Sequence, residues 1–236
     1  MHNQLKKYKI FIAGHNGMVG TALKNYLINN NVKKIITATR KKLNLEVANQ
    51  VNTFIEKNKP DIIINCAGKV GGILANSTYP TDFLYENIYI QANLIKSAHK
   101  NNVKHFINLG SSCIYPKNAK QPIKEKYLLS SELEKTNEAY ALAKIVGLKA
   151  CQFYNEQYGT NYFTLMPCNL YGPNDNFDSK KSHFVPALIK KFNNAKMSKN
   201  KTVEIWGSGK PKREIMHVKD LASAIFFILN KKISNN

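Results

Sequence analysis

The chain has 236 residues, of which 43% are hydrophobic and 10% aromatic, so it carries enough apolar surface for a folded core and is not disordered. Its formal net charge of +20 would be typical of a nucleic-acid-binding protein. Only Arg40 and Arg213 are arginines, however, and the lysines are scattered in ones and twos without interleaved aromatic residues. We therefore attribute the charge to composition and solvated faces, and we predict no nucleic-acid partner.

The sequence also limits where the protein works. It contains no apolar run long enough to cross a bilayer, and its first residues contain no apolar signal-peptide region. The four cysteines, Cys66, Cys113, Cys151 and Cys168, form no C-x-x-C pair and have no zinc-type spacing with the histidines. We therefore expect a cytoplasmic protein with no membrane contact, no disulfide scaffold and no metal site.

Short apolar runs alternate with segments of helical periodicity along most of the chain. The apolar runs predict strands at residues 8–13, 33–39, 61–66, 103–109 and 162–166. The periodic segments predict helices at residues 18–29, 46–58, 82–100, 137–157 and 218–230. This alternation predicts an α/β fold with a Rossmann-type, doubly wound parallel sheet that helices cover on both faces. From Tyr171 the alternation lapses into Gly-, Pro-, Asn- and Lys-rich sequence, where we expect a smaller region to begin.

A glycine-rich turn lies between the first predicted strand and the first predicted helix. Gly14, Gly17 and Gly20 give it the spacing G-x-x-G-x-x-G. Such a turn lets the backbone approach a pyrophosphate that is held at the helix N-terminus. A plain tight turn would also use glycines, but the position in the first strand–helix turn favours a dinucleotide site.

The end of the second predicted strand distinguishes between the two nicotinamide cofactors. Enzymes that use NAD usually place Asp or Glu there, but this chain has Thr39, Arg40 and two lysines, with no carboxylate before Glu46. A guanidinium can bind a 2′-phosphate through two hydrogen bonds, whereas a carboxylate would repel it. A solvated basic turn is the alternative in a lysine-rich chain, but the scarcity of arginine favours NADP(H) as the cofactor.

Three residues whose side chains could act together in catalysis come later in the sequence than the glycine turn. Ser111 comes just after the fourth predicted strand, and Tyr140 and Lys144 share one face of the helix at 137–157. A neighbouring ammonium favours phenolate, so we expect Lys144 to lower the pKa of Tyr140 from about 10. A Y-x-x-x-K pattern on a surface helix also occurs by chance, but its combination with Ser111 and the glycine turn predicts a catalytic set.

Five motifs are distributed along the chain: AGHNGMVG at 13–20, KVGGI at 69–73, GSSCIYP at 110–116, NLYGP at 169–173 and WGSG at 206–209. Together they resemble the GDP-L-fucose synthase family of the extended short-chain dehydrogenase/reductase superfamily. The resemblance extends from Lys9 to about Leu229. It implies epimerisation of GDP-4-keto-6-deoxy-D-mannose at C3 and C5, followed by reduction of C4 by NADPH to give GDP-L-fucose.

The resemblance also implies roles for individual residues. Ser111, Tyr140 and Lys144 would form the reductase triad, and Cys113 and His183 would be the base and acid of the epimerisations. The implied cofactor contacts are Gly14, His15, Asn16, Gly17, Met18, Val19, Gly20, Arg40, Lys144, Pro167, Cys168, Asn169, Leu170 and His183. The implied contacts to the nucleotide-sugar substrate are Lys191, Trp206 and Arg213. Asn16 and Lys191 replace basic residues and arginine, respectively, that are frequent in the family.

Some of these residues also have simpler interpretations. His183 could begin a helix that Ser182 caps, and Trp206 could pack in a core. The side chains of Cys66, Cys151 and Cys168 are expected to be buried apolar groups.

The sequence divides into three parts on this interpretation. Residues 1–170 are predicted to be the NADP-binding Rossmann domain, and 171–217 part of the substrate-binding region. Residues 218–236 are predicted to return to the Rossmann domain as a helix. By the resemblance, we expect the substrate-binding region to be truncated at its C-terminal side. We also expect a homodimer that pairs through helices 82–100 and 137–157.

Two other functions fit parts of the sequence. A nucleotide-sugar 4-epimerase or 4,6-dehydratase of the same superfamily would retain NAD(H) and would have little use for Arg40 or Cys113. A non-catalytic NADPH-binding regulator would typically have lost the triad, which is intact here. Consumption of NADPH in proportion to product would distinguish the reductase from both.

Overall fold

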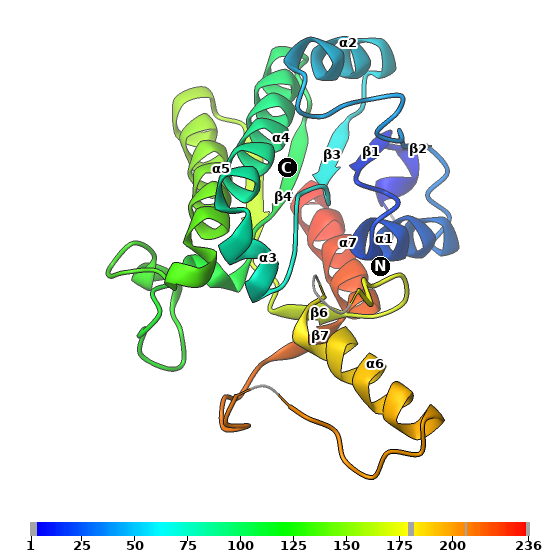
Figure 1. Ribbon diagram of the computed structural model, residues 1–236. Helices are drawn as coiled ribbons and strands as arrows, with labels where there is room; N and C mark the ends of the chain where they lie inside the picture. The colour runs from blue at the N-terminus through cyan, green and yellow to red at the C-terminus, as the bar shows by residue number, and fades with distance from the viewer. Residues whose placement is uncertain (1–3, 179–181, 206, 235–236) are drawn as a thin grey trace.

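A computed structural model describes residues 4–178, 182–205 and 207–234, and its central element is a parallel sheet of five strands in the order β2-β1-β3-β4-β5 (Figure 1). The strands are β1 Ile10–Ala13, β2 Ile35–Ile36, β3 Ile62–Asn65, β4 His105–Leu109 and β5 Asn161–Leu165. The order reverses between β1 and β3, which is where open α/β sheets bind ligands beyond the carboxyl ends of their strands. The predicted fold class is confirmed.

Helices cover both faces of this sheet, as the sequence predicted. They are α1 Met18–Asn29, α2 Ala48–Asn58, α4 Pro80–Lys100, α5 Glu138–Tyr158 and α7 Val218–Ser234; the short helix α3 Ile73–Thr78 precedes α4. Ile10 and Ile12 of β1 pack with α1 and α7 on one face. Phe11 of β1 and Phe106 of β4 pack with α2, α4 and α5 on the other face. Alternate residues of buried strands therefore supply two separate cores.

The last helix returns to the Rossmann sheet. Leu221, Ile225 and Leu229 of α7 lie in the same buried cluster as Leu23 and Leu27 of α1. The side chains recur at helical spacing, so one face of α7 is buried against α1. None of the helices within the described residues is long and apolar enough to span a membrane.

A smaller unit lies below the five-stranded sheet in Figure 1. It contains α6 (Phe184–Met197) and a two-stranded parallel sheet of β6 (Asn169–Tyr171) and β7 (Ile215–His217). Apart from a possible helix start at His183, the sequence pattern did not predict these elements. The apolar residues of α6 do recur at helical spacing, but the surrounding sequence is rich in Lys and Asn and the helix was not predicted; much of its apolar surface is exposed.

Two predicted boundaries are wrong in detail. Strand β2 has two residues rather than the seven of segment 33–39, because only Ile35 and Ile36 pair with β1; further on, the amides of Lys42 and Leu43 bind the carbonyl oxygen of Thr39 and turn the chain. Helix α6 is capped by His183 and not by Ser182, and its cap makes no side-chain hydrogen bond.

Candidate active site

The glycine turn after β1 is built around close backbone contacts. Gly14 has a φ of 79°, a left-handed conformation that favours glycine. A Cβ at Gly14 would also lie 2.7 Å from the backbone nitrogen of Ala67, which follows β3. At Gly20 a Cβ would collide with the carbonyl oxygen of Gly14. Helix α1 therefore approaches the switch point of the sheet at a distance that side chains at these positions would prevent.

This turn fits the pyrophosphate of a dinucleotide. Helix α1 begins at Met18 and has no acidic residue in its first turn, so the positive end of its dipole is not neutralised by a carboxylate there. The amide of Gly17 closes the turn on the Gly14 carbonyl oxygen at 3.1 Å. Burial and Lys24 lower the pKa of His15, whose ring hydrogen-bonds the backbone of Ala38 beyond β2. The exposed Asn16 extends the same turn without adding a charge.

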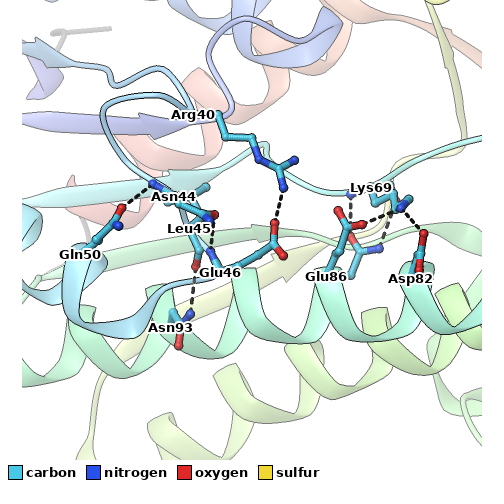
Figure 2. Close-up of polar contacts among 10 residues, drawn as sticks. Arg40, Asn44, Leu45, Glu46, Gln50, Lys69, Asp82, Glu86 and Asn93 are labelled. Carbon is cyan, nitrogen blue, oxygen red and sulfur yellow. Dashed lines mark hydrogen bonds and ion pairs between the residues drawn. The ribbon is translucent and has the colours of Figure 1, made fainter.

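Arg40 has a partner that the sequence did not reveal. Its Nη2 lies 2.6 Å from Oε1 of Glu46, because the chain after β2 folds back on itself (Figure 2). No carboxylate stands between Arg40 and Glu46 in the sequence, but in the folded chain the carboxylate of Glu46 itself reaches the guanidinium. The Arg40 side chain is 74% exposed and that of Glu46 only 23%.

Four of the predicted catalytic side chains lie in one cluster at the carboxyl ends of the strands. Ser111 follows β4, and its Oγ accepts a hydrogen bond from the amide of Cys113 at 3.5 Å. The Ser111 hydroxyl is also hydrogen-bonded to Tyr140 of α5. The Nζ of Lys144, one helical turn further along α5, lies 5.5 Å from the centroid of the Tyr140 ring. The structure thus brings together Ser111, Cys113, Tyr140 and Lys144.

Lys144 is buried with a specific hydrogen bond. Its side chain is 4% exposed, and its Nζ donates to the carbonyl oxygen of Leu109 at 2.8 Å. Burial lowers its pKa to about 8, and the thiols of Cys113 and Cys66 oppose that shift. The ammonium and its neutral form are therefore both accessible near neutral pH.

Burial, and not Lys144, has the largest effect on the pKa of Tyr140. Burial raises the pKa of Tyr140, Cys113 raises it further, and the hydrogen bond from Ser111 only opposes the rise. The predicted lowering of this pKa by the ammonium is therefore wrong, because desolvation of the phenolate has the larger effect. Tyr140 is therefore a neutral phenol at physiological pH, which is the form that donates a proton.

Cys113 differs from the other three cysteines in its surroundings. Burial raises the pKa of its thiol, while the Ser111 hydroxyl and Lys144 act to lower it. Cys151 is fully buried, as predicted, but Cys66 and Cys168 are only partly buried, because they lie where the strands give way to loops. All four are free thiols.

His183 lies at the start of α6, in the smaller unit. It is exposed on one side, yet the protein atoms around it desolvate the imidazolium and lower its pKa, and Asp175 opposes this shift. Within the described part of the chain, Asp175 is the charged group that acts on the His183 ring, and no hydrogen bond joins His183 to Cys113. The structure therefore does not bring the expected acid and base into contact.

The expected substrate contacts also belong to the smaller unit. Lys191 is on α6, and its Nζ donates to the carbonyl oxygen of Glu204 at 3.0 Å. Arg213 precedes β7, is exposed and donates to the carbonyl oxygen of Lys212 at 2.9 Å. Trp206 lies outside the described residues. The segment 167–170 follows β5 and includes the first two residues of β6, so it leads from the Rossmann sheet into this unit.

A buried polar network beneath the cluster was not predicted. Asn65 of β3 donates to Asn108 of β4 at 3.0 Å, and Asn108 donates to Gln91 of α4 at 3.0 Å. Gln91 in turn donates to the carbonyl oxygen of Ala143, the residue before Lys144, at 3.1 Å. Polar residues within otherwise apolar strands were the available sequence signal. This network attaches α5, which carries Tyr140 and Lys144, to the sheet.

Comparisons with known proteins agree with this geometry. Residues 10–236 match the family described as the NAD dependent epimerase/dehydratase family. The GDP-L-fucose synthase of Escherichia coli K12 is 48% identical over 225 residues, covering 95% of this chain and 70% of the relative. The GDP-L-fucose synthase 1 of Arabidopsis thaliana is 48% identical over 226 residues, covering 96% and 70%.

Solved structures give the same result. A GDP-L-fucose synthetase from Naegleria fowleri bound to NADP has a TM-score of 0.85 at 27% identity, covering 95% of this chain and 73% of that one. A GDP-6-OMe-4-keto-L-xylo-heptose reductase from C. jejuni has a TM-score of 0.89 at 36% identity, covering 97% and 74%. The chain therefore belongs to the NAD dependent epimerase/dehydratase family and, within it, to the GDP-L-fucose synthases.

Proposed function

We propose that this protein converts GDP-4-keto-6-deoxy-D-mannose to GDP-L-fucose by epimerising C3 and C5 and reducing C4 with NADPH. The observation that carries the proposal is the position of Cys113 beside Ser111, Tyr140 and Lys144. Relatives named GDP-L-fucose synthase support the substrate, and neighbours solved with NADP support the cofactor.

The cofactor contacts follow from the glycine turn and its surroundings. The turn from Gly14 to Gly20 would hold the pyrophosphate at the start of α1, and Arg40 would bind the adenosine 2′-phosphate. Lys144, His183 and the segment 167–170 would hold the remainder. Bound there, the cofactor supplies the hydride that reduces C4.

The triad would act on the oxygen at C4. Ser111 and Tyr140 share a hydrogen bond and would both donate to that oxygen. The same two donors stabilise an enolate during epimerisation and a developing alkoxide during reduction. Because burial keeps Tyr140 neutral, its phenol carries the proton that the alkoxide takes up.

The epimerisations require a base and an acid. The C4 carbonyl acidifies the protons on C3 and C5, and Cys113 would remove them as a thiolate. Lys144 favours that thiolate, against the burial that raises the pKa of Cys113. His183 would return a proton on the opposite side from its imidazolium form and end as the neutral ring, which its lowered pKa favours.

The smaller unit would bind the nucleotide sugar. We assign residues 1–170 to the NADP-binding domain, 171–217 to part of the substrate-binding region, and 218–236 to the returning helix. Lys191, Trp206 and Arg213 would contact the substrate. Arg213 suits a diphosphate because a guanidinium binds two oxygens of a phosphate at once.

We also propose a cytoplasmic homodimer that has no nucleic-acid partner. Helices α4 and α5 expose Tyr85, Tyr89, Leu142, Val146 and Phe153. An apolar surface on two adjacent helices suits a second copy of the chain. Light scattering coupled to size-exclusion chromatography tests the assembly, and salt titration on a nucleic-acid column tests the charge.

The amount of NADPH oxidised per product formed distinguishes this function from the two alternatives. A 4-epimerase or 4,6-dehydratase regenerates its cofactor in each cycle, and a regulator turns nothing over. We expect one NADPH to be oxidised for each product formed from GDP-4-keto-6-deoxymannose. Product formation without loss of nicotinamide absorbance would contradict the proposal.

A further inference from the structure

The loop after β2 holds Glu46 in a defined position. The amide of Glu46 donates to Oδ1 of Asn44 at 3.1 Å, and the amide of Asn44 donates to Oε1 of Gln50 at 3.0 Å (Figure 2). Asn93 of α4 donates to the carbonyl oxygen of Leu45 at 2.9 Å. These bonds tie the backbone immediately before Glu46 to α2 and α4.

The two members of the Arg40–Glu46 pair are therefore unequal. The carboxylate is mostly covered and follows a backbone that hydrogen bonds fix, whereas the guanidinium is largely exposed on a turn. The fold thus places the carboxylate, and Arg40 reaches toward it. One guanidinium nitrogen is already used, and the remaining donors face solvent or a ligand.

A phosphate bound by Arg40 would meet this carboxylate. Two anions on one guanidinium lie a few ångströms apart and repel each other. A ribose 2′-hydroxyl is neutral and can donate to a carboxylate, which is how an acidic residue near this position selects NAD. Glu46 therefore weakens binding of the phosphorylated cofactor and strengthens binding of the unphosphorylated one. Lys41 and Lys42 are exposed on the same turn and keep its total charge positive.

We propose that Glu46 is a specificity-determining residue that limits the preference of this enzyme for NADPH over NADH. The inference rests on the proposed binding of the 2′-phosphate by Arg40. The pair then sets a ratio: Arg40 provides the preference for NADPH, and Glu46 reduces it.

The test is direct binding of NADPH and of NADH, measured by titration calorimetry on the full chain. Glu46→Gln keeps the shape and the hydrogen-bonding capacity of the side chain and removes its charge. We expect it to raise the ratio Kd(NADH)/Kd(NADPH) by about fivefold, the size of a partly exposed charge interaction. Glu56→Gln removes the same charge from an exposed site on α2, about 12 Å along the helix from its start, and should leave the ratio unchanged.

Arg40→Gln separates this inference from the proposed function. If Arg40→Gln lowers the ratio but Glu46→Gln leaves it unchanged or lowers it, the role of Glu46 is wrong and that of Arg40 stands. If Arg40→Gln leaves the ratio unchanged, the 2′-phosphate is not at Arg40 and both assignments are overturned. Thermal unfolding of each variant without nucleotide reports whether the loop remains folded. A Glu46→Ala variant repeats the measurement, and its ratio must move in the same direction.

Discussion

The ammonium of Lys144 lies 5.5 Å from the centroid of the Tyr140 ring, yet it donates its hydrogen bond to the carbonyl oxygen of Leu109 at 2.8 Å. The two side chains are neighbours on one face of α5, but the strand end fixes the lysine. This arrangement explains why burial, and not the ammonium, decides the protonation of Tyr140.

Tyr140→Phe tests the proposed role of Tyr140 as the proton donor in the reduction of C4. The variant keeps the ring that packs edge-on against Phe83 and loses only the hydroxyl. We expect NADPH binding to persist and reduction to fall by at least about 100-fold, the lower range for a general acid. Single-turnover oxidation of bound NADPH measures the step, and a variant that still reduces at the wild-type rate would exclude Tyr140 as the acid.

Cys113→Ser tests the proposed role of Cys113 as the base of the epimerisations. A serine hydroxyl is far less acidic than a thiol, so exchange of solvent deuterium into C3 and C5 of the substrate should stop while the Kd of NADPH is unchanged. Cys151→Ala, at a buried cysteine that packs among apolar residues of the sheet face covered by α2, α4 and α5, is the control and should exchange normally. Exchange at the wild-type rate in Cys113→Ser would show that another group removes the protons.

The lowered pKa of Lys144 predicts how the free energy of unfolding depends on pH. Its pKa of about 8 in the folded protein lies below the 10.5 of an unperturbed lysine. Between these two values the unfolded chain binds more protons, so stability rises with pH; the cost of burying the ammonium is complete below pH 8. Relative to Lys144→Met, wild type should gain on the order of 3 kcal/mol between pH 7 and pH 10.5.

Urea unfolding of both proteins at a series of pH values measures this difference. The comparison with the variant cancels the titration of groups that the two proteins share. A constant difference across the series would mean that Lys144 has its ordinary pKa. We also expect Lys144→Met to be catalytically inactive at every pH.

Gly14→Ala tests the cofactor turn. Alanine there would meet both an unfavourable φ and the backbone of Ala67 at 2.7 Å. Gly159→Ala is a matched control, because Gly159 has a φ of 65° and no atom lies within 4 Å of an added Cβ. The control should lose about 1 kcal/mol of stability from backbone strain and bind NADPH normally. Gly14→Ala should lose more stability and most of its NADPH affinity; equal losses in the two variants would remove the close approach as an explanation.

The sequence predicted elements better than it predicted interactions. Helix α1 was predicted at its observed bounds, and β1, β3, β4 and β5 were found within a few residues, because buried strands and amphipathic helices leave clear periodicities. Helix α6 was missed although its apolar residues recur at helical spacing, and β6 and β7 were missed because each has only three residues. Strand β2 was overestimated because only Ile35 and Ile36 pair with β1.

In the candidate site, too, the sequence predicted which residues come together better than it predicted their interactions. The order of Ser111, Tyr140 and Lys144 identified a cluster that the fold does assemble. The direction of the Tyr140 pKa shift was wrong, because desolvation depends on the packing of several elements around the phenol. The Arg40–Glu46 pair was also invisible in the sequence, since it depends on how a loop folds back.

The most direct test of the account is the stereochemistry of the product. Purified protein is incubated with GDP-4-keto-6-deoxy-D-mannose and NADPH, and the nucleotide sugar is identified by NMR. The account predicts GDP-L-fucose, with C3 and C5 both inverted, C4 reduced and one NADPH consumed per molecule. A reduced product that retains the original configuration at C3 and C5, or no reduced product at all, would contradict it.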